Sequence, residues 1–229
     1  MYILTTMKKS FILFLTSLFF ITSCYQNVSF GNDSTLELSY FQYQSEDQDL
    51  LLELPELNDQ LIFKNQGNDE LLKFNVIKSI NDKHLHQRPT MPVGVKKYFY
   101  FDGQQLFLQS TLFHPNDFTS YLEFHVRKWP KVFNQTTGEV SEESYLRTTI
   151  EYSSFNNLGQ LIDIDYSEQI TLSFNNQVFD RVIKVDLTDK DSISPNWQTP
   201  SLDYMYFDIN KGLIGFDDKE GNEWRILSN

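Results

Sequence analysis

Apolar and polar residues alternate in many short stretches of this chain. In residues 121–128, Leu122, Phe124 and Val126 alternate with charged or imidazole-bearing residues, and residues 144–153 show the same pattern. Successive side chains of a β-strand point to opposite faces of the sheet, so this alternation predicts strands with one buried and one solvated face. Apolar positions at helical spacing are nowhere sustained beyond about ten residues. Strands are also predicted over residues 35–43, 204–207, 212–217 and 223–227.

Clusters of turn-forming residues separate these stretches and predict hairpins. Asp102-Gly103 is the strongest hairpin signal in the chain. Pro89 and Pro92 interrupt residues 83–93, which we therefore expect to form a loop. The predicted hairpins join residues 61–63 to 71–80, residues 97–101 to 104–113, and residues 170–174 to 178–187. A further turn is predicted at residues 156–159, and a polar loop at residues 189–200.

The composition favours strands over helices. The 229 residues include 20 Phe and 12 Tyr but no Ala, which is the best intrinsic helix former. About ten to twelve short strands with regular turns predict an all-β fold, either an antiparallel β-sandwich or a partly open barrel with long loops. We expect one domain over residues 35–229, with a subdivision near residue 144 as the alternative.

The start of the chain has the organisation of a bacterial export signal. Lys8 and Lys9 precede an apolar run over residues 11–21, which is too short for a membrane-spanning helix of roughly 20 residues. Small residues and then Cys24, the only cysteine of the chain, follow this run. The pattern resembles the lipobox of bacterial lipoproteins. The alternative is a plain signal peptide followed by an incidental cysteine.

The resemblance to lipoproteins implies an anchor and a location. In that family the cysteine thiol receives a diacylglycerol, the chain is cut before the cysteine, and the new amine is acylated; two or three acyl chains anchor a protein stably. Residues 1–23 would then be a signal peptide, Cys24 the lipid-attachment residue and residues 24–34 a tether. Tyr25 stands where some inner-membrane lipoproteins carry a retention aspartate, which favours the periplasmic face of the outer membrane.

The charge balance argues against a nucleic-acid partner. The chain carries 19 basic and 31 acidic residues, and its net charge of −12 becomes about −14 once Lys8 and Lys9 leave with the signal peptide. An anionic domain is repelled by phosphate backbones. We expect the protein to meet the membrane through its lipid and to contact an envelope protein, a glycan or a lipid.

The C-terminal residues carry a second resemblance. They read ITLSFNNQVFDRVIKVDL and, further on, YMYFDINKGLIGFDDKEGNEWRIL. This is similar to the ends of uncharacterised lipoproteins of the Bacteroidota, in which an aromatic strand, a Gly-Leu-Ile-Gly-Phe strand and a closing Gly-x-x-Trp follow a hairpin. A similar strand pair occurs in half-barrel lipoprotein carriers of the Lol type, although fold alone does not define function. The matching residues are Phe179, Val182, Tyr206, Gly212, Leu213, Ile214, Phe216, Gly221 and Trp224.

Histidines and aromatic residues are the first candidates for a site. His84 and His86 could bind one metal ion if both lay on one face of a strand, but no third ligand can be assigned from the sequence. The alternative is a solvated polar loop. Trp129, Trp197 and Tyr204 could stack on a sugar or an apolar ligand, the alternative being that they pack in the core.

Two groups of acidic residues are weaker candidates. The group around Gly221 lacks the alternating spacing of a calcium-binding loop. The group at residues 163–168 could flank a glycosidic bond, although acidic residues on a solvated sheet face are far commoner. The first group comprises Asp217, Asp218, Glu220 and Glu223, and the second Asp163, Asp165 and Glu168. The motifs of serine hydrolases, zinc proteases and phosphate-binding loops do not occur in the sequence.

These patterns predict a membrane-anchored envelope lipoprotein with a non-catalytic binding or structural role and no cofactor. The first alternative is a half-barrel carrier of lipids or lipoproteins, and the second is a hydrolase acting on glycans. A binding module requires a patch of exposed aromatic residues, and a carrier requires an apolar cavity. A hydrolase requires carboxylates or histidines that converge in a cleft.

Overall fold

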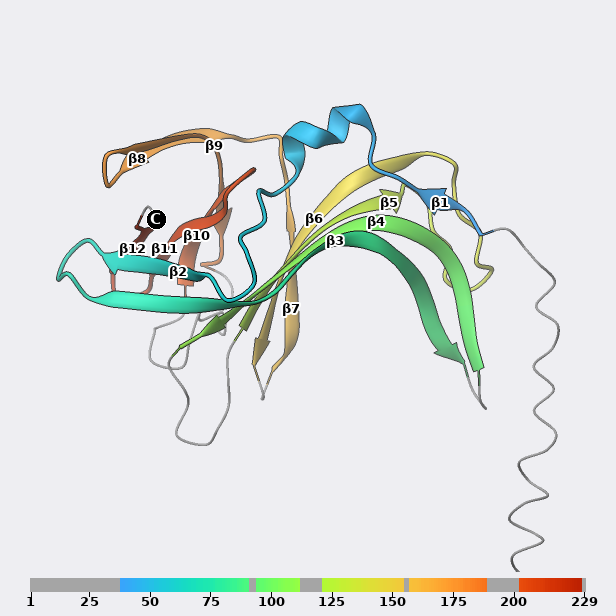
Figure 1. Cartoon of the computed structure of the whole chain (residues 1–229), viewed down its shortest axis with the longest axis horizontal. Coiled ribbons are helices and arrows are strands. Elements are labelled where there is room, and N and C mark those ends of the chain that lie inside the picture. Colours follow the sequence, from blue (N-terminus) through green and yellow to red (C-terminus); the bar gives the residue numbers. More distant parts are fainter. Residues whose placement is uncertain (1–37, 91–93, 112–120, 155–156, 189–201, 228–229) are drawn as a thin grey trace, which may run out of the picture. The chain divides into compact units, whose positions relative to one another are not determined.

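The computed structural model describes residues 38–90, 94–111, 121–154, 157–188 and 202–227, which belong to one compact unit, Leu38–Asn229. The leader, Cys24, the tether and Trp197 lie outside these ranges. Strands dominate the described residues, and the predicted all-β fold is confirmed (Figure 1). No helix within these ranges has the length and apolar character needed to cross a bilayer.

The strands follow one another with a single short 3-10 helix, η1, between the first two. That helix was not predicted from the sequence. The elements are β1 (Tyr40–Phe41), η1 (Ser45–Leu50), β2 (Gln60–Asn65), β3 (Leu71–Thr90), β4 (Gly94–Ser110), β5 (Tyr121–Pro130), β6 (Ser144–Ser154), β7 (Asn157–Ile164), β8 (Ile170–Phe174), β9 (Gln177–Asp186), β10 (Leu202–Asp208), β11 (Gly212–Asp218) and β12 (Glu223–Ile226).

Two antiparallel meanders make up the sheet. Among the described residues, eleven strands pair in the order β7-β6-β5-β4-β3-β2-β12-β11-β10-β9-β8, and β1 adds to β4 in parallel. The meanders β2–β7 and β8–β12 join where β12 pairs with β2, with Trp224 opposite Asn65 and Ile226 opposite Phe63. The sheet curls into an open half-barrel, as the partly open barrel prediction required (Figure 1).

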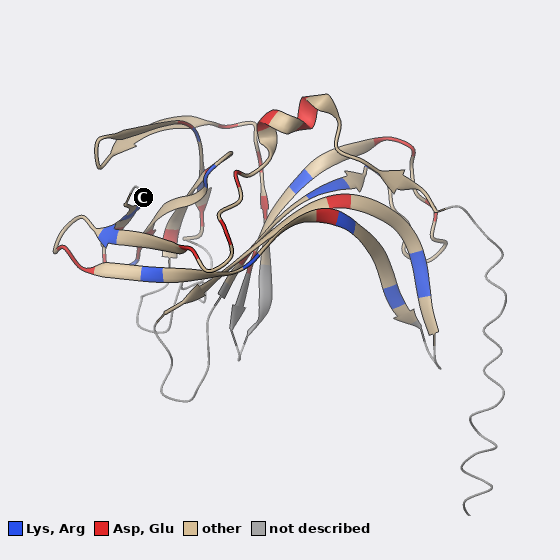
Figure 2. Cartoon of the chain, in the orientation of Figure 1, with Lys and Arg blue, Asp and Glu red and all other residues tan. Residues whose placement is uncertain are grey.

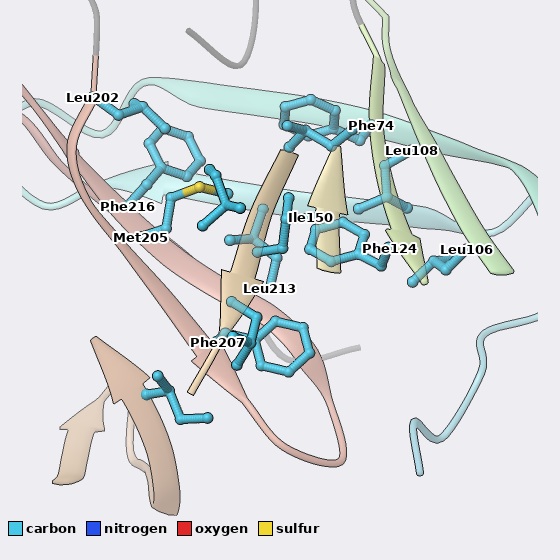
Figure 3. Packing of buried hydrophobic residues seen from close by; sticks show 14 of the residues in the cluster. Phe74, Leu106, Leu108, Phe124, Ile150, Leu202, Met205, Phe207, Leu213 and Phe216 are labelled. Atoms are coloured by element: carbon cyan, nitrogen blue, oxygen red, sulfur yellow. The ribbon is translucent and has the colours of Figure 1, made fainter. Parts of the chain in front are cut away.

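The main core fills the inner face of this curl. Phe124 of β5 stacks on Phe207 of β10, with ring centroids 5.9 Å apart, so strands from the two meanders face each other. The buried half of the alternation predicted for β5 is confirmed, because Leu122, Phe124 and Val126 are all fully buried. The predicted solvated face is wrong at His125, which is 4% exposed. Figure 3 shows side chains of both meanders meeting in this core: Phe74, Leu106, Leu108, Phe124, Ile150, Leu202, Met205, Phe207, Leu213 and Phe216.

A buried ion pair links β5 to η1. Lys128, at the end of β5, donates from its Nζ to both carboxylate oxygens of Asp47 in η1, at 2.9 and 2.7 Å. Both side chains are almost fully buried. Asp47 also accepts the backbone N–H of Gln44 at 2.7 Å. Pairing and hydrogen bonding together offset the cost of removing these charges from water.

The predicted loop at residues 83–93 is wrong for the described residues up to Thr90. β3 continues through Thr90, with Pro89 paired opposite Val95. The pairing of β2 with β3 ends at Asn75, and beyond Val76 no other described strand pairs along that edge of β3. Proline has no N–H to donate, but an edge position requires none, so Pro89 is compatible with the strand.

The predicted hairpin at Asp102-Gly103 is also wrong. β4 runs unbroken through both residues. Asp102 accepts the hydroxyl of Tyr40 and the backbone N–H of Tyr43, at 2.5 and 2.9 Å. A Cβ on Gly103 would lie 2.8 Å from the His84 ring, so this glycine permits a close approach rather than a turn.

The other predicted turns have mixed outcomes. The hairpin between β8 and β9 is confirmed, and Asn175 and Asn176 have the positive φ angles, 49° and 61°, of a tight hairpin turn. The hairpin between β2 and β3 and the last three strands are confirmed as well. The strand predicted over residues 35–43 is reduced to Tyr40–Phe41 in its described part, and β7 begins at Asn157, inside the predicted turn at 156–159.

Candidate functional site

The half-barrel contains a cavity of about 670 Å³, open to solvent, between β9 and β2. Its apolar lining includes Leu61 of β2, Leu106 of β4, Phe179 of β9, Ile214 of β11 and Ile226 of β12. Ligand pockets have volumes of roughly 300–1,000 Å³ and a mainly apolar lining with a few polar groups. The cavity therefore has the size and chemistry of a site for a small apolar or amphipathic molecule.

Long-range contacts hold the walls of the cavity in place. The segment after η1 packs on the turn between β10 and β11, where the Glu53 backbone N–H donates to the Asn210 carbonyl at 2.7 Å. The Asn210 side chain donates in turn to the carbonyls of Asp49 and Leu51, at 3.1 and 3.2 Å. On the other side, Asn175 in the β8–β9 turn donates to the Ile226 carbonyl at 3.0 Å. Four separate elements thus meet around one space.

The rim of the cavity is polar and charged. Glu53 and Lys211 form an exposed ion pair beside it, and Arg181 donates to the Asp49 carbonyl at 2.8 Å. Acidic residues are concentrated on η1 and on the segment between η1 and β2 (Figure 2). That segment forms one wall of the cavity. Val178 also lies on the lining and is 64% exposed, which places it at the mouth. An amphipathic ligand would find apolar walls inside and polar partners at the opening.

The histidine pair predicted from the sequence lies on β3. His84 stacks on Phe101 at 5.4 Å, and its Nε2 lies 3.1 Å from the Gly103 carbonyl oxygen. His86 packs among aromatic rings, and its pKa is lowered by burial and by the nearby Arg127 charge. Among the residues that the structure describes, neither histidine belongs to a group of three potential metal ligands.

The aromatic candidates pack against their neighbours. Trp129 is half-buried and meets Phe99 edge-on, with ring centroids 5.0 Å apart. Tyr204 of β10 lies under the Lys184 ammonium group, which is 3.5 Å from the ring centroid. Trp197 lies outside the described residues. The structure does not bring Trp129 and Tyr204 together, since they belong to different aromatic clusters.

Several of the acidic candidates have structural partners. Asp218 is 2% exposed and accepts the backbone N–H groups of Glu220 and Asn222, both at 3.0 Å, so it organises the β11–β12 turn. Asp163 receives two hydrogen bonds from Arg147, at 2.7 and 3.2 Å. Asp165 accepts the Ser167 N–H at 2.9 Å.

A polar cluster lies on β4, β5 and β6, on the face of the sheet away from the main core, which the alternating pattern predicts to be solvated. Gln105, His125 and Thr149 are directly opposite one another across the three strands. Gln105 Oε1, His125 Nδ1 and Thr149 Oγ1 are buried and have no hydrogen-bond partner in the described part of the chain. Leaving such an atom unpaired costs about 1–3 kcal/mol. A row of three is unusual enough to suggest a ligand.

Charged groups flank this row. Burial lowers the pKa of His125 to about 3, helped by the charges of Arg127 and Lys78, so the imidazole is neutral. Burial and the charge of Glu151 raise the pKa of Glu123. Burial also lowers the pKa of Arg127, whose Nε has no partner among the described residues. Perturbed groups that converge in this way are typical of functional sites.

Sequence reasoning missed both features for the same reason. Leu61 and Val178 are ordinary strand residues until the pairing of β12 with β2 brings them around one cavity. Glu123 and Glu151 become neighbours only through the pairing of β5 with β6. The one local signal was His125, a residue with a ligating side chain at an alternating position of a strand.

No protein-family model, curated protein or solved structure matches this chain. Its function is therefore inferred from the geometry of its own residues.

Proposed function

We propose that this protein is a membrane-anchored envelope lipoprotein whose β domain binds an apolar or amphipathic ligand without chemically altering it. The cavity of about 670 Å³ between β9 and β2 carries the proposal. Its apolar walls favour a hydrocarbon or aromatic body, and its charged rim favours a polar head that stays near the opening. The anchor is proposed from the lipobox-like sequence that ends at Cys24.

A role in carrying lipids is the specific form of binding that the cavity favours. A carrier needs an apolar space that opens to solvent, so that the ligand can enter and leave. Val178 at the mouth is well exposed, whereas Leu106 on the lining is 2% exposed. An open half-barrel offers such a space, because its edge strands β7 and β8 are not paired with each other in the described part of the chain. A lipid tether at Cys24 would hold this cavity close to a membrane that supplies the ligand.

The ligand proposal is tested with a soluble form of the full chain that carries Cys24→Ser. We expect lipids or other amphiphiles to co-purify with it and to be seen by mass spectrometry. We also expect the fluorescent apolar probe N-phenyl-1-naphthylamine to bind and to be displaced by fatty acids. Absence of both co-purified amphiphile and saturable probe binding would exclude the proposed binding function.

Two valine substitutions locate the site. Val178→Trp places a large ring at the mouth of the cavity and should weaken probe binding by more than about tenfold, a loss of roughly 1.4 kcal/mol. Val132→Trp is the matched control, because Val132 is also 64% exposed but does not line the cavity. Equal probe affinity in the two variants would place the ligand elsewhere.

The anchor has its own test. Metabolic labelling with palmitate should mark the wild-type protein and not the Cys24→Ser protein. Label that persists after this substitution would show that Cys24 is not the lipid-attachment residue, whatever the result of the probe experiment.

A further inference from the structure

The polar cluster on β4, β5 and β6 contains a set of metal-ligand atoms that the proposed cavity does not use. Glu123 and His125 lie two residues apart on the same face of β5, and Glu151 lies directly opposite Glu123 on β6. His125 Nε2 is 3.2 Å from Glu123 Oε2, and each of the three side chains offers a ligand atom within 4.8 Å of the others.

We propose that Glu123, His125 and Glu151 bind a divalent transition-metal ion such as Zn²⁺. Zinc bonds to nitrogen and carboxylate oxygen are about 2.0–2.2 Å long, so ligand atoms around a tetrahedral ion lie roughly 3.4 Å apart. The His125–Glu123 separation already meets this distance. Rotation of the half-buried Glu151 side chain brings its carboxylate to the same ion, and water completes the coordination.

The unpaired polar atoms around His125 are evidence for a bound ion that does not depend on the two carboxylates. Thr149 is 1% exposed, lies directly across from His125, and its Oγ1 has no partner within the described ranges. His125 Nε2 is hydrogen-bonded to Glu123 Oε2, and Nδ1 has no partner among the described residues. With an ionised Glu123 as the acceptor, this bond requires the ring proton on Nε2. Coordination through Nε2 moves the ring proton to Nδ1. Metal-bound histidines usually donate this proton to a nearby acceptor. Gln105 and Thr149, the residues paired with His125 on the two neighbouring strands, each carry a buried oxygen that has no partner among the described residues.

Three cationic side chains near the cluster lower its affinity for a metal ion. Arg147 is held by Asp163, and the Lys78 ammonium group lies 4.6 Å from the centroid of the Phe107 ring. Burial and the charge of Arg147 lower the pKa of Arg127, whereas the charges of Glu151 and Glu123 act in the opposite direction, so Arg127 interacts with the same two carboxylates. A metal ion must share these carboxylates with Arg127, so Arg127→Gln should tighten metal binding.

The test is calorimetric titration of Zn²⁺ alone into the chelator-treated, full-length Cys24→Ser protein. We expect one ion per chain. Glu151→Gln, at a half-exposed position that should not impair folding, is expected to lower the affinity by more than about tenfold, and His125→Gln likewise. Co²⁺ bound in place of Zn²⁺ should show a visible absorption band that His125→Gln changes.

Two matched controls define the site. His84→Gln removes a histidine of β3, which β4 separates from β5, and Glu143→Gln removes an exposed, ion-paired glutamate; both should bind Zn²⁺ as the wild type does. Absence of saturable binding at millimolar Zn²⁺ would overturn the proposal, as would unchanged affinity in Glu151→Gln. Val178→Trp should leave Zn²⁺ binding unchanged, so failure of the cavity proposal and failure of the metal site are distinguishable.

Discussion

Thr148 and Thr149 are neighbours in β6, both are 1% exposed, and they point to opposite faces of the sheet. On the core side, the Thr148 hydroxyl is hydrogen-bonded to the hydroxyl of Tyr166. On the other side, the Thr149 hydroxyl has no partner among the described residues. Equal burial therefore has different consequences on the two faces. The Thr148 hydroxyl is paired on the core side, whereas four buried side-chain atoms of the opposite face have no partner among the described residues.

The same contrast runs along β5. Its core-facing residues Leu122, Phe124 and Val126 are fully buried among apolar side chains. Its opposite face presents Glu123, His125 and Arg127, all with pKa values shifted mainly by burial. Apolar packing stabilises the fold, whereas incompletely paired buried polar groups cost stability. Packing on the core face thus offsets the free-energy cost of the buried polar groups on the opposite face. Such a cost is expected where the polar face serves a function.

The largest predicted effect on stability comes from a substitution in the core-facing side of β5. Phe124→Ala should lower the free energy of unfolding by about 3–5 kcal/mol, because it deletes a fully buried ring that stacks on Phe207. Urea unfolding monitored by circular dichroism measures the change. Leu161→Ala is the control, since Leu161 is 46% exposed and should cost less than about 1 kcal/mol. Comparable losses in both variants would contradict the assignment of the core face.

An intermediate effect is expected from the two threonines. Thr148→Val should lower the free energy of unfolding by about 1–2 kcal/mol, because it leaves the Tyr166 hydroxyl without its partner. Thr149→Val in the metal-free protein should leave that free energy unchanged or raise it by up to about 1 kcal/mol, because it removes an atom that has no partner. Both are measured by urea unfolding with a chelator present. A larger loss for Thr149→Val than for Thr148→Val would reverse the comparison.

The smallest effect concerns pH. Burial, reinforced by Arg127, lowers the pKa of His86 below its usual value of 6.5. The unfolded chain therefore takes up a proton below pH 6.5 that the folded protein resists, and stability falls as the pH is lowered from 7 to 5. His86→Phe keeps an aromatic ring at this position and should reduce the fall by less than about 1.4 kcal/mol per pH unit. The measurement is the unfolding free energy of both proteins at pH 7 and pH 5.

His125 should contribute to the same fall in both proteins, since its pKa is also lowered. The difference between wild type and His86→Phe therefore isolates His86. An identical pH dependence in the two proteins would mean that His86 is not shielded from water.

Sequence signals predicted the structure correctly where it depends on interactions between residues that are close together in the chain. The two asparagines at 175 and 176 tolerate the positive φ angles of a tight turn, and the alternation in residues 121–128 reflects the strand period. Asp102-Gly103 misled because its residues serve partners far away in the chain: Asp102 binds Tyr40 and Tyr43, and Gly103 makes room for His84. From the sequence alone, an Asp-Gly pair that forms a turn cannot be distinguished from one whose side chain and space serve residues far away in the chain.

By itself, the sequence determined the strand-rich character of this protein, the core-facing residues of β5 and the hairpins β2–β3 and β8–β9, because these depend on the period of the strand and on turn chemistry between neighbours. The tertiary structure alone decided where the sheet curls, which strands face one cavity, and that Glu123, His125 and Glu151 meet. Those outcomes depend on pairings between residues far apart in the chain, such as Ile226 with Phe63, and on burial that no single segment encodes.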